Sequence, residues 1–239
     1  IANPAYNFYF CKGYYSRIAE GKMNGRVGRL LVSPLISAMK KMNHNNSSYL
    51  DFLSSFRYTL AGEFSFRRRL IRDVRIPSDW GLEVGILSEI QRNFANNMVC
   101  QVDIADKYDH KHQSISFDDP EKGLSKMSID IIKTLIRKQA SQGIGYNRDT
   151  LRALKATYYR TALDYISSYS YDAEMNDIKL DINTEESYVE LFSENIMKAG
   201  ERVLDNPVKL NLMPNWSRVR SAVPFIYEKL IDAVERDNS

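Results

Sequence analysis

The stretch YNFYFCKGYY at residues 6–15 consists mainly of residues that favour β-strands, and we expect a strand here. A short polar turn follows. In GRVGRLLVSPLISAMKKM, residues 25–42, the apolar residues then recur at helical spacing. Ser33 and Pro34 form a helix-start signal within this stretch, so it predicts two helices or one kinked helix. A strand that leads into a helix is typical of a mixed α/β fold.

The rest of the chain changes character near residue 118. Before that point the pattern predicts alternating helices and strands: a helix at 49–56, a strand at 57–61, a helix at 80–94 and a buried strand at 98–104. After it the pattern predicts helices at 124–140, 150–169, 185–204 and 219–234, the last with Pro224 inside it. We therefore expect an α/β unit at residues 1–117 and a mainly helical C-terminal region at 118–239.

Composition excludes several classes of protein. The 239 residues are 44% hydrophobic and 26% charged, which is ordinary for a globular chain. With 33 Lys and Arg against 30 Asp and Glu, the net charge of +3 argues against a dedicated nucleic-acid binder. No apolar run is long enough to cross a bilayer. Cys11 and Cys100 predict two free thiols in a reducing cytoplasm, and the start at Ile1 suggests the interior of a longer protein.

The first candidate for chemistry is NGRVGRLL at residues 24–31, where two glycines flank an arginine at the start of a helix. Free backbone N–H groups at a helix N-terminus attract anions, and Gly25 and Gly28 would let the backbone approach a ligand closely. Arg26 can clamp a phosphate or a carboxylate through two hydrogen bonds. An ordinary surface arginine at a helix start would give the same pattern.

Two further motifs place a glutamate beside glycine. In TLAGEFSFR, residues 59–67, Glu63 follows the predicted strand end, where ligands of open α/β sheets bind. A capped turn explains it equally well. In WGLEVG, residues 80–85, Glu83 lies in the first turn of an apolar helix, where the helix dipole favours a carboxylate. Glu83 could also bind sugar hydroxyls or help to hold a metal.

The motif DHKHQ at residues 109–113 contains two of the three histidines of the chain. On an extended segment, His110 and His112 would face the same side, beside Asp109. Histidine is the commonest metal ligand, and Mg²⁺ or Mn²⁺ can be held by such a loop together with substrate phosphates. An exposed polar loop is the alternative.

In this order, KGYYSR, GRVGRL, LAGEFS, WGLEVGIL, VDI and HKHQ resemble the later half of the glucosyl-3-phosphoglycerate synthases, over about residues 8–140 and more loosely to the end. The resemblance implies the later half of a GT-A-type nucleotide-sugar transferase fold. It also implies a cytoplasmic enzyme that transfers glucose, with retention, from a nucleotide-glucose donor to the 2-hydroxyl of 3-phosphoglycerate, in the synthesis of a compatible solute.

The resemblance also implies roles for individual residues. His110 would ligate a Mg²⁺ or Mn²⁺ ion that bridges the donor diphosphate, and His112 would lie near the acceptor. Glu83, the candidate catalytic residue, would lie in the sugar pocket with Gly81 before it. The acceptor would be cradled by Gly25, Arg26, Val27 and Gly28, and the donor glucose would be lined by Leu60, Ala61, Gly62 and Glu63.

Such enzymes carry an N-terminal nucleotide-binding half with an Asp-x-Asp motif, which this sequence lacks. We therefore expect a fragment, or a chain whose first half is separate or was cleaved, with little or no activity of its own.

Other functions stay open. One alternative is a helical dimerisation or binding module, in which tyrosines of the later helices would form an interface or would pack internally. Another is a related mannosyl-transferring enzyme. A metal-dependent hydrolase on Asp109, His110 and His112 is a third. Binding of RNA through Arg67–Arg69 is the weakest, because the charge is near neutral. A homodimer is expected in the transferase as well.

Overall fold

The computed structural model describes residues 3, 5–105, 122–207, 209 and 212–238. Its main sheet has the strand order β4-β1-β6, in which β1 runs parallel to β6 and antiparallel to β4. The three strands span Phe10–Tyr15 (β1), Phe64–Phe66 (β4) and Val99–Ala105 (β6). The described residues also form two short antiparallel pairs of strands: Ile18–Ala19 (β2) with Lys22–Met23 (β3), and Ile76–Pro77 (β5) with Leu212–Met213 (β7).

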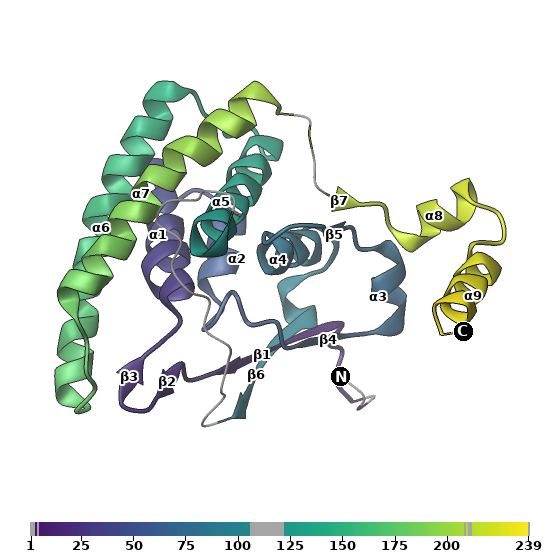
Figure 1. Cartoon of the computed structure of the whole chain (residues 1–239), viewed down its shortest axis with the longest axis horizontal. Coiled ribbons are helices and arrows are strands. Elements are labelled where there is room, and N and C mark those ends of the chain that lie inside the picture. Colours follow the sequence, from purple (N-terminus) through teal and green to yellow (C-terminus); the bar gives the residue numbers. More distant parts are fainter. Residues whose placement is uncertain (1–2, 4, 106–121, 208, 210–211, 239) are drawn as a thin grey trace.

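Helices lie on one side of this sheet (Figure 1). The earlier part of the chain forms Val27–Val32 (η1, a π-helical segment), Ser33–Met42 (α1), Ser48–Ser54 (α2), Arg68–Asp73 (α3), Leu82–Asn93 (α4) and the 3-10 turn Asn96–Met98 (η2). The later part forms Gly123–Ser141 (α5), Arg148–Met175 (α6), Ile182–Asp205 (α7), Trp216–Ala222 (α8) and Ile226–Asp237 (α9). The mixed α/β fold and the helical C-terminal region are thus confirmed. The GT-A assignment stays a prediction.

Local sequence signals fix the two longest helices. Asn147 caps α6: its side chain accepts from the backbone N–H of Thr150 at 2.9 Å, and the Thr150 hydroxyl accepts from the backbone N–H of Asn147 at 2.7 Å. Asp181 caps α7 through the backbone N–H of Thr184 at 3.2 Å. These caps satisfy N–H groups that a helix start otherwise leaves without acceptors.

One hydrophobic core joins the earlier and later parts of the chain. It includes Phe10, Leu30 and Ile86 from the earlier part, and Ile132 and Val203 from the later one. The boundary expected between residues 117 and 118 lies outside the described residues, so the two-domain division stays a prediction.

Three expected elements need correction. Residues 57–61 form a loop rather than a strand; here Tyr58 lies against the guanidinium of Arg17. The strand at 98–104 is not buried, because β6 lies at the edge of the sheet that the described residues form, and Val102 and Ile104 are exposed. The helix at 219–234 is two helices, α8 and α9, because Pro224 cannot donate the hydrogen bond that a continuous helix needs.

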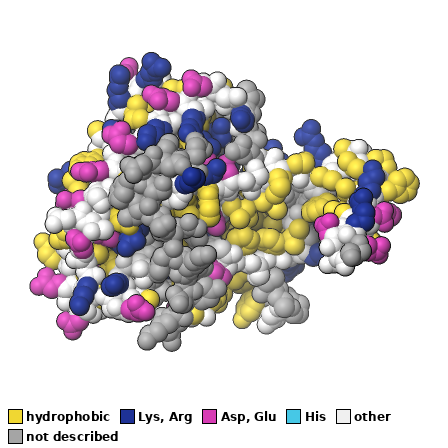
Figure 2. All heavy atoms as spheres, viewed as in Figure 1, with side chains coloured by type: hydrophobic (Ala, Val, Ile, Leu, Met, Phe, Trp, Pro, Cys, Tyr) yellow, Lys and Arg dark blue, Asp and Glu magenta, His cyan; other side chains and the backbone are white. Residues whose placement is uncertain are grey.

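Most of the tyrosines of the later helices pack internally, as one of the two alternatives predicted. Tyr158 is fully buried and donates to the backbone oxygen of Leu30 at 2.6 Å. The hydroxyl of Tyr165 hydrogen-bonds to that of Ser37 at 2.9 Å, whereas Tyr171 is exposed. Apolar side chains remain exposed elsewhere: they gather between α4 and the C-terminal arm of α8 and α9 (Figure 2). In the described residues, no helix is both apolar enough and long enough to cross a membrane.

Gly85, in α4, packs so closely against β5 that a Cβ there would overlap the Cγ atom of Pro77. We expect Gly85→Ala to destabilise the fold by about 1 to 3 kcal/mol, because the rigid proline ring and the helix must separate. Urea unfolding measures the change. Gly145→Ala is the control, since no described atom lies within 4 Å of a Cβ at that position. Equal stability of the two variants would contradict this packing.

Candidate functional site

A cavity of about 180 Å³ opens at the start of η1. Six of the residues that the sequence singled out line it: Gly25, Arg26, Val27, Gly28, Leu60 and Glu83. The other lining residues are Arg17, Asn24, Tyr58, Trp80, Leu124, Met127 and Ile131. The fold therefore brings the arginine–glycine loop and the Glu83 helix together from positions more than fifty residues apart in the sequence.

The remaining sequence candidates lie elsewhere. Four of them are not among the lining residues of the cavity: Ala61, Gly62, Glu63 and Gly81. The first three follow the lining residue Leu60 in the sequence, and Gly81 packs against Thr134 of α5. His110 and His112 lie outside the described residues, as does Asp109. Among the residues that are described, no group of three or more His, Cys, Asp and Glu side chains is placed to hold a metal ion. The metal site stays a prediction.

Each of the two glycines of the loop has a structural reason: Gly25 allows the backbone to turn, and Gly28 leaves room for the ring of Tyr58. Gly25 has a φ of +74°, a conformation that favours glycine, and a Cβ there would lie 3.2 Å from Cγ of Arg17. A Cβ on Gly28 would lie 3.2 Å from Cε2 of Tyr58. The loop is further fixed by the backbone N–H of Asn24, which donates to the backbone oxygen of Arg17 at 2.7 Å.

Two arginines give the cavity its positive charge. The Arg26 guanidinium stacks over the ring of Tyr188 in α7 at 4.8 Å, and that of Arg17 lies 5.7 Å from the ring centre of Tyr58. The Nε atoms of both arginines are buried and have no hydrogen-bond partner among the described residues. Buried donors without acceptors are costly, so an anion bound here would supply the acceptors that the described residues do not.

Glu83, in the first turn of α4, provides negative charge on another wall of the same cavity. Burial raises the pKa of its carboxyl group, and the charge of Glu63 acts in the same direction. A backbone hydrogen bond and the nearby Lys12 oppose that rise. A Cβ on Gly62 would lie 4.0 Å from Oε1 of Glu83, so the 60–63 segment reaches this carboxylate.

Lys12 is the site residue that sequence reasoning missed. Only 1% of it is exposed; its ammonium donates to the backbone oxygen of Ala61 and lies 5.5 Å from the ring centre of Phe64. Burial lowers its pKa to about 8, although Glu83 and Glu63 both favour the charged form. The available signal was its register: Lys12 lies two residues after the buried Phe10, on the same face of β1.

The later helices hold the loop in place. Arg29, one turn after Arg26, makes two contacts with the carboxylate of Glu185 in α7, at 2.6 and 3.1 Å. Its guanidinium also donates to the backbone oxygens of Met23 and Asn24, and it stacks over Tyr169 of α6 at 5.0 Å. The arrangement of the arginine–glycine loop thus depends on side chains more than 130 residues later in the chain.

The chain is similar over its whole length to curated proteins. It is 42% identical to glucosyl-3-phosphoglycerate synthase from Persephonella marina and 40% identical to that from Methanococcoides burtonii, matching 100% and 99% of this chain. It spans 59% and 58% of the length of those two relatives. A glucosyl-3-phosphoglycerate synthase from Petrotoga mobilis is 26% identical over 140 residues, 56% of this chain and 38% of that relative.

These matches confirm the resemblance that the sequence motifs predicted. No protein-family model matches the chain. Among solved structures, the mannosyl-3-phosphoglycerate synthase from Rubrobacter xylanophilus matches with a TM-score of 0.45 and 24% identity, over 59% of this chain and 40% of that one.

Proposed function

We propose that this chain supplies the acceptor-binding part of a glucosyl-3-phosphoglycerate synthase. The enzyme would transfer glucose from a nucleotide-glucose donor to the 2-hydroxyl of 3-phosphoglycerate. The observation that carries the proposal is the shared cavity, in which the loop of Gly25 to Gly28 faces the helix of Glu83. The similarity to synthases along the full chain supports the same activity.

The charges of the cavity suit an acceptor that carries both a phosphate and a carboxylate. Arg26 would hold one of these groups, with the amides at the start of η1. Arg17 would add charge on the same wall. Fixing both ends of a three-carbon acid orients its 2-hydroxyl, which lowers the entropic part of the barrier to transfer.

Glu83 would bind the transferred sugar. Its carboxylate would accept hydrogen bonds from glucose hydroxyls, and the charge of Lys12 would oppose the rise that burial causes in the pKa of Glu83. Retention would follow from attack on the face that the leaving group departs from. The anomeric C–O bond to the diphosphate breaks, the bond to the acceptor oxygen forms, and the hydroxyl proton passes to the departing phosphate. Glu83 then needs no covalent bond to the sugar.

The Mg²⁺ or Mn²⁺ ion that the resemblance implies would be held through His110 and would neutralise charge on the departing diphosphate. Because that histidine is outside the described residues, no step above depends on the ion. A homodimer formed through the helices after residue 118 is proposed on the sequence alone.

The test is the thermal unfolding of the chain with 3-phosphoglycerate, with nucleotide-glucose and Mg²⁺, and with neither. At saturating acceptor, about 100 times the Kd, we expect the midpoint to rise by about 5 to 10 °C. Arg26→Ala should abolish this rise. The exposed Arg218→Ala, on α8, should retain it.

The donor should give a much smaller shift, because the chain spans only 59% of the length of the Persephonella relative. If neither compound shifts the midpoint, the binding-module alternative is favoured. A shift that survives in Arg26→Ala would remove this loop from the acceptor site.

A further inference from the structure

A second cavity, also of about 180 Å³, lies between later turns of α4 and α5. Its charged lining comes from four segments: Arg75 before β5, Asp79 after β5, Glu89 and Arg92 on α4, and Arg137 and Lys138 on α5. Leu212 of β7 also lines it. The two cavities have no lining residue in common, although α4 and α5 line both.

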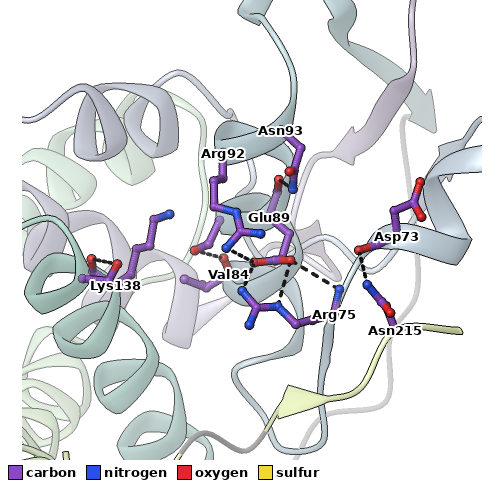
Figure 3. Close-up of polar contacts among 10 residues, drawn as sticks. Asp73, Arg75, Val84, Glu89, Arg92, Asn93, Lys138 and Asn215 are labelled. Atoms are coloured by element: carbon purple, nitrogen blue, oxygen red, sulfur yellow. Dashed lines mark hydrogen bonds and ion pairs between the residues drawn. The ribbon is translucent and has the colours of Figure 1, made fainter. Parts of the chain in front are cut away.

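One buried carboxylate balances part of the positive charge. Glu89, 6% exposed, accepts from the guanidinium of Arg75 at 3.3 and 3.4 Å, and its carboxylate lies 4.0 Å from the guanidinium of Arg92. Figure 3 shows both arginines reaching Glu89 while Lys138 extends from the neighbouring helix. A single carboxylate thus faces two arginines before the α5 cations are counted.

The two cations of α5 share their nearby carboxylates with other cations. Asp79 and Asp130, which act on Arg137, also pair with Lys133, and Glu89, which acts on Lys138, also pairs with Arg75. The Nε atom of Arg137 is buried and has no hydrogen-bond partner among the described residues. The ammonium of Lys138 lies over the ring of Tyr49 at 5.4 Å. The other lining carboxylate, Asp79, lies 3.9 Å from the ammonium of Lys133, which also pairs with Asp130 at 2.6 Å.

The pKa shifts of Arg137 and Lys138 also favour a bound anion. Burial lowers the pKa of Arg137 and of Lys138. For Lys138, the charges of Arg92 and Arg75 lower it further and Glu89 opposes them; for Arg137, Asp79 and Asp130 oppose the effect of burial. Half-buried cations that face other cations destabilise the fold, and a bound anion would offset this.

We propose that this cavity is a second anion site, which binds inorganic phosphate or a small phosphorylated acid through Arg137 and Lys138. Arg75 and Arg92, already shared with Glu89, would contribute longer-range attraction. A guanidinium beside an ammonium is suited to phosphate oxygens. The volume is below the roughly 300 Å³ at which sites for drug-sized ligands begin, which favours a small anion over a nucleotide.

The site can be tested separately from the proposed acceptor cavity by working in an Arg26→Ala background. Inorganic phosphate is titrated into that protein by calorimetry, and we expect saturable binding. Adding Arg137→Gln and Lys138→Gln should weaken binding by about tenfold or more for each charge removed. The charge-matched control adds Arg218→Gln and Lys229→Gln on the exposed C-terminal arm, and should retain the affinity.

A second variant distinguishes loss of the binding site from loss of the fold. Lys138→Glu places an anion within the cavity, so it should abolish phosphate binding while it raises the thermal midpoint in the absence of phosphate. Tighter binding of 3-phosphoglycerate than of phosphate by the Arg26→Ala protein would identify a phosphorylated acid as the ligand, and equal binding would identify free phosphate. Absence of phosphate binding in Arg26→Ala would overturn the proposal. Undiminished binding in the Arg137 and Lys138 double variant would also overturn it.

Discussion

Replacing Arg29 by methionine is expected to destabilise the fold by about 3 to 5 kcal/mol, the largest loss we predict for a single residue. The Arg29 side chain is 13% exposed and that of its partner Glu185 only 5%. Without the guanidinium, the carboxylate of Glu185 remains buried and loses its ion pair. Two backbone oxygens, of Met23 and Asn24, also lose a donor. Urea unfolding at pH 7 measures the loss.

Two further variants separate the ion pair from simple loss of side-chain volume. Arg29→Met combined with Glu185→Met should recover much of the stability, because no charge is then left buried. Arg152→Met removes an exposed pair with Asp149, whose side chains are 71% and 86% exposed, and should cost less than about 1 kcal/mol. A similarly small cost for Arg29→Met would show that the η1–α7 contact does little to stabilise the fold.

Lys12→Met is expected to remove a pH dependence that the unchanged protein shows between pH 7 and 10. The pKa of Lys12 is about 8 in the folded chain against 10.5 when exposed. In that window the unfolded chain therefore binds more protons, and the free energy of unfolding of the unchanged protein should rise with pH. Each pKa unit corresponds to about 1.4 kcal/mol, so the rise attributable to Lys12 is about 2 to 3 kcal/mol.

The comparison of the two proteins isolates Lys12, because tyrosines and other lysines titrate in both. Unfolding by urea is measured for each at several pH values, and the difference between them is plotted against pH. A difference that grows from pH 8 upward supports a buried, protonated Lys12 at neutral pH. A constant difference would mean that its ammonium has an ordinary pKa and is exposed to water.

Much of the fold could be predicted from the sequence, because helix caps and apolar spacing are signals that lie within each element. The start of the long helix α6 follows from a capping residue, Asn147, and the course of α5 from apolar spacing. The loop around Arg26 was predicted because glycines and an arginine at a helix start form a recognisable anion motif. The strand expected at 57–61 was wrong because its β-forming residues pack against Arg17 through Tyr58 instead of joining the sheet.

The rest could not be predicted because it depends on contacts between distant segments. Nothing in the sequence around Lys12 indicates that the charges of Glu63 and Glu83 will act on it. The pairing of Arg29 with Glu185 joins residues 156 positions apart, and nothing in either neighbourhood indicates the other. Prediction from motifs therefore found residues that line one cavity and missed residues that hold them in place.

The attachment of the arginine–glycine loop to α7 has a consequence for motion. Because Tyr188 supports Arg26 and Glu185 holds Arg29, the loop cannot open freely while α7 stays packed on α6. A compound seated on the loop should therefore slow hydrogen exchange in helices that never touch it. The pair of helices α6 and α7 thus limits the movement of the loop, and we expect its rigidity to restrict which small acids the cavity can accept.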